Sequence, residues 1–83
     1  MKLKNEIPTI RAAFEPNEQR IKQYAADLRA NGKYKDFGTR LAWDCLYALI
    51  GTEQICKWYT LYNCHDNHIT TAARAVLKEL NVL

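Results

Sequence analysis

Residues 36–51 constrain the fold more than any other stretch, because they have the pattern of one capped and largely apolar helix. Asp36 is a good N-cap, since its carboxylate can accept from the open amides of the first turn. Gly51 suits the position after the last turn, where a left-handed backbone is common. One face carries apolar side chains at helical spacing: Phe37, Leu41, Cys45, Ala48 and Leu49. Only Arg40 and Asp44 form a polar strip, so we predict a helix that is buried nearly all round.

Apolar residues that recur every three or four positions predict the remaining helices. These helices are expected at about 6–14, 16–30, 53–62 and 68–80. The predicted apolar stripe of the fourth is Ile55, Trp58, Tyr59 and Tyr62, and that of the fifth is Ile69, Ala73, Val76, Leu77 and Leu80. A short strand is an alternative over 7–10. Pro16 is expected to end the first element, because the residue before a proline avoids the helical region. Thr52 is the predicted cap of the fourth helix, and Asp66 or Asn67 that of the fifth.

Length and composition predict one helical domain over residues 1–83. The chain is 48% hydrophobic and 25% charged, which is ordinary for a globular protein. The predicted helices are joined by short connections, as in a helical bundle. We therefore expect an all-α fold, a compact single-domain bundle of four to five short helices around a central buried helix at about 37–50. That helix is shorter than about twenty apolar residues and carries charge, so no membrane partner is expected.

The cysteines and the first residues of the chain indicate the cellular compartment of the protein. Residues 1–6 carry charge, and no apolar segment of the length of a signal peptide follows them. The chain has three cysteines, an odd number. Without an export signal they are expected to be reduced thiols, which predicts a cytoplasmic protein.

The stretch with the most reactive and metal-ligating side chains is a cluster of cysteine and histidine. Cys56, Cys64, His65 and His68 could supply the four ligands of a zinc site. Their spacing fits no established zinc finger, and a buried thiol beside two loop histidines is the simpler interpretation. Cys64 could act as a nucleophile with His68 as its base. The sequence has no paired carboxylates and no glycine-rich phosphate loop to accompany such a pair. We therefore expect no metal ion, no other cofactor and no enzymatic activity.

Positive charge is concentrated in the first half of the chain. The net charge is +3, while residues 1–40 hold nine Lys and Arg against five Asp and Glu. The basic side chains of the second helix and the following loop flank Tyr34; they are Arg20, Lys22, Arg29, Lys33 and Lys35. An aromatic ring between cations can stack on a base or dock on an acidic protein patch. A solvated helix face and loop is the simpler interpretation.

The last two helices resemble a helix-turn-helix in their order. The fifth helix would present base-contacting and phosphate-contacting types on its outer face, namely Asn67, His68, Thr71, Arg74 and Lys78. Its expected connection, residues 63–67, is long and polar and lacks the usual glycine. A nucleic-acid-binding regulator is therefore the alternative function. It would use the basic first half, including Arg20 and Lys22, or Arg74 and Lys78 of the last helix.

Aromatic residues give the leading functional hypothesis. Five fall within twenty residues: Trp43, Tyr47, Trp58, Tyr59 and Tyr62. Most should be core, but Trp43 and Tyr47 border the Arg40–Asp44 strip. Trp, Tyr and Arg together are the usual anchors of a protein interface. The predicted partner-binding residues are Trp43, Tyr47, Arg40, Tyr34, Lys33, Lys35 and Arg29.

These observations favour a small non-enzymatic helical protein that binds a protein partner. Accessory proteins of phages and plasmids, including anti-CRISPR-like inhibitors of host defence, are of this type. A homodimer is also plausible, because a small core with spare aromatic side chains gains stability by burying more of them.

Overall fold

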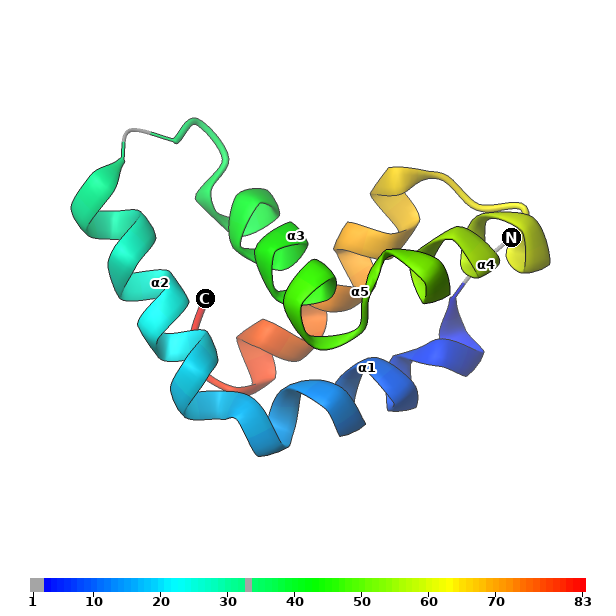
Figure 1. Cartoon of the computed structure of the whole chain (residues 1–83), viewed down its shortest axis with the longest axis horizontal. Coiled ribbons are helices and arrows are strands. Elements are labelled where there is room, and N and C mark those ends of the chain that lie inside the picture. The colour runs from blue at the N-terminus through cyan, green and yellow to red at the C-terminus, as the bar shows by residue number, and fades with distance from the viewer. Residues whose placement is uncertain (1–2, 33) are drawn as a thin grey trace.

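The chain forms a series of helices joined by short loops (Figure 1). The computed structural model describes residues 3–32 and 34–83, and no strand occurs in those ranges. The α-helices are α1 (Ile7–Phe14), α2 (Glu18–Asn31), α3 (Phe37–Leu49), α4 (Thr52–Tyr62) and α5 (Asp66–Glu79). Short 3-10 turns, η1 (Lys4–Glu6) and η2 (Glu15–Asn17), precede α1 and α2. The predicted all-α bundle is confirmed. None of the described helices has the length and apolar character needed to cross a membrane.

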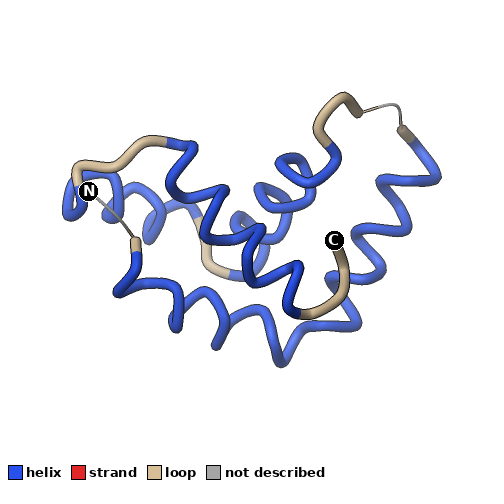
Figure 2. Tube along the Cα trace, turned by 180° about the vertical axis from the view of Figure 1, so that it is seen from behind, coloured by secondary structure: helices blue, strands red, loops and turns tan. Residues whose placement is uncertain are grey.

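The helices pack at different angles to one another and do not form parallel layers. In Figure 1, α1 and α2 form a bent arm along one side, and α3 lies inside the bend. Seen from behind in Figure 2, α5 crosses the molecule and ends near α2. α5 packs against α1 and α3, and α2 packs against α3. The C-terminal end is tied to α2, because Arg29 Nη2 donates to the carbonyl of Val82 at 3.4 Å.

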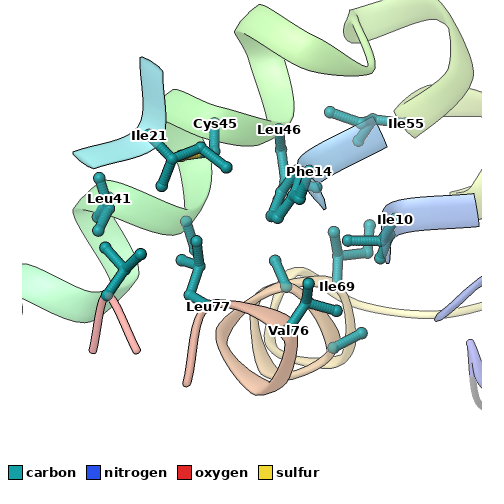
Figure 3. Packing of buried hydrophobic residues seen from close by; sticks show 14 of the residues in the cluster. Ile10, Phe14, Ile21, Leu41, Cys45, Leu46, Ile55, Ile69, Val76 and Leu77 are labelled. Carbon is teal, nitrogen blue, oxygen red and sulfur yellow. The ribbon is translucent and has the colours of Figure 1, made fainter. Parts of the chain in front are cut away.

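All five α-helices contribute to the core (Figure 3). The largest fully buried side chains include Trp58, Phe14, Ile10, Ile21, Leu41 and Leu46. The stripe predicted for the last helix is confirmed at four positions, since Ile69, Ala73, Val76 and Leu77 of α5 are all buried. Leu80, the fifth predicted position, is half-buried and follows the end of the helix.

α3 has the predicted caps but buries only one face. The amide of Thr39 donates to Asp36 Oδ1 at 3.1 Å, and Gly51 takes a positive φ of 102°. The buried residues of α3 are Leu41, Ala42, Cys45 and Leu46. Ala48 is exposed, so its predicted place on the buried face is wrong. α2 and α5 cover one side of α3, while Ala48 and Tyr47 face solvent.

α1 ends at Phe14, as predicted, but Pro16 does not move Glu15 out of the helical region as expected. Glu15 is helical, with φ −55° and ψ −48°, and the chain continues through η2 into α2. A proline in the first turn of a helix is tolerated because its missing N–H would have no partner there. The side-chain amide of Asn17 donates to the Ala13 carbonyl at 2.8 Å, which satisfies an acceptor at this junction. Residues 7–10 are helical, so the strand alternative is also wrong.

Two predicted N-caps are wrong by one or more positions. α4 begins at Thr52 itself, with Gly51 as the cap. α5 begins at Asp66, and His65 is its cap. The backbone amide of His65 donates to His68 Nδ1 at 2.9 Å. The imidazole of His68 thus takes the part that Glu or Gln plays in a capping box, which sequence rules for caps do not anticipate.

Candidate functional site

The solvent-facing side of α3 carries a stacked aromatic pair. The rings of Trp43 and Tyr47 lie one turn apart, with centroids 5.4 Å from each other and planes inclined by 23°. Trp43 is half-buried against the core, whereas Tyr47 is 54% exposed. Side chains four residues apart face one another on a helix, and stacking limits the motion of both rings. The pair therefore offers a large and ordered contact surface to solvent.

Arg40 connects this pair to the loop before α3. Its Nε lies 3.3 Å from Asp44 Oδ1, and its guanidinium carbon lies 5.4 Å from the centroid of the Tyr34 ring. Tyr34 in turn packs against Gly32, where an added Cβ would lie 2.0 Å from the ring. The structure thus brings Tyr34, Arg40 and the Trp43–Tyr47 pair, four of the predicted partner-binding residues, into one continuous region.

A pocket of about 500 Å³ opens beside this pair. We call it the aromatic pocket, and it is lined by Arg40, Trp43, Asp44, Tyr47, Tyr59 and Asp66. These residues come from α3, α4 and α5. The hydroxyl of Tyr59 donates to the carboxylate of Asp66. Burial and this hydrogen bond raise the pKa of Tyr59 well above its usual value, so its phenol stays neutral near pH 7.

Sequence reasoning did not place Tyr59 and Asp66 in this site. Tyr59 was expected in the apolar stripe of its helix, and Asp66 was expected as a cap. The available signal was the neighbouring pair Trp58 and Tyr59. Successive helical residues point about 100° apart, so only one of them can enter the core directly. Trp58 does so, with no exposed surface, and Tyr59 is directed to the pocket.

Arg29 and Lys35, two other predicted partner-binding residues, do not line the pocket. The guanidinium carbon of Arg29 lies 4.6 Å from the centroid of the Phe37 ring, so Arg29 connects α2 to the start of α3. Lys35 is exposed in the loop that precedes α3. Lys33 lies outside the described residues. Of the described residues in the predicted set, Tyr34, Arg40, Trp43 and Tyr47 therefore form one region, and Arg29 and Lys35 lie apart from the pocket.

Two of the four candidate nucleic-acid residues, Arg20 and Lys22, make contacts within their own helix. Lys22 pairs with Glu18 at 2.8 Å, and Arg20 donates to the hydroxyl of Tyr24 at 2.8 Å. Arg74 approaches the start of α3, where an added Cβ on Gly38 would lie 3.4 Å from its Nε. Lys78 is exposed. These four cations lie on two different helices, α2 and α5.

The turn between α4 and α5 is shorter than predicted. Its non-helical residues are 63–65 rather than 63–67. Asn63 adopts the left-handed conformation, with φ 47° and ψ 45°. It thus takes the backbone geometry for which a glycine was expected, since asparagine tolerates this region better than most residues.

The four candidate zinc ligands do not converge. Cys56 is exposed on α4, whereas Cys64 is buried and its Sγ donates to the Trp58 carbonyl at 3.5 Å. Burial raises the pKa of Cys64, which disfavours the thiolate form needed by a ligand or nucleophile. The rings of His65 and His68 stack on each other at 5.6 Å. In residues 3–32 and 34–83, no three His, Cys, Asp or Glu side chains are arranged to hold a metal ion.

Comparison of the chain with protein-family models, with curated proteins and with solved structures found no match.

Proposed function

We propose that this chain is a small non-enzymatic binding protein that engages a protein partner through the aromatic pocket. The observation that carries the proposal is the Trp43–Tyr47 stack, which is partly exposed beside Arg40. Tyr, Trp and Arg dominate the binding energy of protein interfaces, because each buries a large area around a polar group.

The order of the pocket walls supports the same function. Arg40 is held between Asp44 and Tyr34, and Tyr59 is held by Asp66. Side chains that are already ordered lose less conformational entropy when a partner binds. Binding to this pocket therefore costs little free energy for ordering its side chains. The pocket also combines polar and aromatic side chains, as the anchor regions of many interfaces do.

The class of binding protein is a narrower proposal. An inhibitor or accessory protein of a phage or plasmid, acting in the cytoplasm with reduced thiols, would need little more than one stable domain and one binding surface. This part of the proposal rests on analogy with accessory proteins of this type and on no motif in the sequence. A second copy of this chain could occupy the same pocket and form a homodimer. A measurement of molecular mass in solution distinguishes that homodimer from a monomer.

Nucleic-acid binding by α5 is the second candidate, and one observation favours it. The turn of three residues between α4 and α5, with Asn63 left-handed, matches a helix-turn-helix better than the sequence indicated. Asn67, Thr71 and Lys78 are exposed on α5. The contact of Arg74 with the start of α3 weighs against it, since that guanidinium is turned toward the fold.

Affinity capture with the purified full chain tests the proposal. We expect a protein to be retained at low and high salt and after nuclease treatment. Retention should be lost with Trp43→Ala and with Tyr47→Ala, because each removes one ring of the stack. Leu61→Ala is the matched control, since Leu61 is an apolar residue 68% exposed on α4 and outside the pocket.

Two results would contradict the proposal. One is capture of the same protein by the parent and by both aromatic variants. The other is retention of nucleic acid alone, with affinity that falls steeply as salt rises, because neutralised phosphates release counterions. The second result would make the α5 surface the functional one.

A further inference from the structure

The aromatic pocket is locally acidic, although the chain as a whole is basic. Its described lining residues carry two carboxylates, Asp44 and Asp66, and one guanidinium, Arg40. The whole chain, by contrast, has a net charge of +3. The guanidinium of Arg40 also lies over the ring of Tyr34, which is not among the residues that line the pocket. The local field at the pocket therefore favours a positive ligand.

Both carboxylates keep capacity to accept further hydrogen bonds. Asp44 Oδ1 lies 3.3 Å from Arg40 Nε, which is longer than the roughly 2.7–2.9 Å of a strong charge-assisted bond. Asp66 accepts from the Tyr59 hydroxyl through Oδ1. An ionised carboxylate offers about four lone-pair positions on two oxygens. Each of the two can therefore bind an additional donor without losing the contact it already makes.

The three rings of the pocket attract cations for a separate reason. The face of an aromatic ring is negative, and Trp and Tyr bind cations better than Phe does. Trp43, Tyr47 and Tyr59 all line the pocket. Tyr59 donates its hydroxyl to Asp66, which places this ring directly beside a carboxylate. Aromatic faces and carboxylates thus select the same sign of charge.

We propose that the aromatic pocket receives an arginine side chain of the protein partner. The inference rests on the proposed function for the statement that the partner is a protein. Arginine fits better than lysine, because its planar guanidinium can stack on an aromatic face and donate to a carboxylate at the same time. A carboxylate of a partner fits poorly, since it would meet Asp44 and Asp66 in the same space.

The test uses the whole chain and needs no partner. Nα-acetyl-arginine amide is titrated into the ¹⁵N-labelled protein at low salt, and the indole N–H signals are followed by NMR. We expect a saturable shift of the Trp43 signal. The Trp58 indole is the internal reference, because it is fully buried and donates to Glu6. The Trp58 signal should not move.

Nα-acetyl-citrulline amide provides the matched ligand control. Citrulline has nearly the shape of arginine but no charge, so its binding should be about tenfold weaker if the charge contributes about 1.4 kcal/mol. Asp44→Asn and Asp66→Asn should each weaken arginine binding, and Asp27→Asn on the exposed face of α2 should not. Equal binding of citrulline and arginine to the parent protein overturns the inference, as does an equal loss with Asp27→Asn.

The two proposals fail in distinguishable ways. If partner capture depends on Trp43 and Tyr47 but the pocket does not prefer arginine over citrulline, only the arginine inference is wrong. If the pocket prefers arginine but capture is insensitive to Trp43→Ala, the arginine site stands and the proposed function is wrong.

Discussion

Trp58 of α4 donates its indole N–H to Glu6 Oε1 at 2.9 Å, across a separation of 52 residues in the chain. The hydroxyl of Tyr62, one turn later, donates to Glu6 Oε2 at 2.9 Å, which raises the pKa of Tyr62. One carboxylate at the end of η1 therefore anchors α4 to the N-terminal segment. With Trp58 held in this way, the next residue, Tyr59, is turned to the aromatic pocket.

Glu6→Ala should destabilise the protein by about 1–3 kcal/mol, because it leaves the N–H of the buried Trp58 without an acceptor. Glu6→Gln keeps one side-chain oxygen and should cost less. Denaturant unfolding followed by circular dichroism measures both. A Glu6→Gln variant as unstable as Glu6→Ala would indicate that charge, rather than the hydrogen bond to Trp58, is what matters.

Leu46→Ala should cost about 2–5 kcal/mol, since Leu46 is fully buried in the core and the substitution leaves a cavity. The identical substitution at Leu61, which is 68% exposed, should change the free energy of unfolding by less than about 0.5 kcal/mol. Thermal melting of the two variants compares them directly. Equal melting temperatures would show that α3 does not contribute its buried face to the core.

Two glycine substitutions should act in opposite directions. Gly38 lies in the first turn of α3, where an added Cβ meets Arg74 Nε at 3.4 Å and Leu83 Cδ1 at 3.5 Å, which are ordinary contact distances. Gly38→Ala should therefore stabilise by about 0.4–1 kcal/mol through the unfolded chain. Gly51 has φ 102° and ψ 152°, a region essentially reserved for glycine, so Gly51→Ala should cost about 1–3 kcal/mol. Denaturant midpoints give both values, and a shift of the same sign would refute this explanation.

The stabilisation that Asp36 contributes as a helix cap should be lost in acid. The hydroxyl and the amide of Thr39 donate to its carboxylate and lower its pKa. A carboxyl with a lowered folded-state pKa stabilises the fold above its unfolded pKa of about 3.9, and this stabilisation is lost as the pH falls through the folded value. Asp36→Asn should therefore reduce the difference in melting temperature between pH 7 and pH 3. An unchanged difference would mean that this cap does not contribute to acid sensitivity.

The parts of the fold that follow from short-range patterns were predictable. The cap at Asp36, the positive φ at Gly51 and the buried stripe of α5 all depend on residues within a few positions of one another. The continuation through Pro16 was not predicted, because the avoidance of the helical region before a proline is a tendency that Glu15 does not follow. The exposure of Ala48 depends on where α2 and α5 pack, which a helical pattern does not specify.

In the candidate site, too, the contacts between nearby residues were predictable and the long-range contacts were not. Arg40, Trp43 and Tyr47 share one helix, so their proximity was predictable from spacing alone. Tyr59 and Asp66 reach the pocket from α4 and α5, where α4 is anchored to Glu6 and α5 begins earlier than its sequence pattern indicates. Those contacts join residues far apart in the chain, and one sequence does not reveal them.

Site-specific photo-crosslinking tests the central claim most directly. A photoreactive phenylalanine is placed at position 47 in the aromatic pocket, at position 78 on α5, or at position 26 on the exposed side of α2. In cell extract, we predict a crosslinked protein at position 47 alone, and we predict that free arginine amide in excess reduces it. Crosslinks to nucleic acid at position 78, with none at position 47, would contradict the account and assign the function to α5.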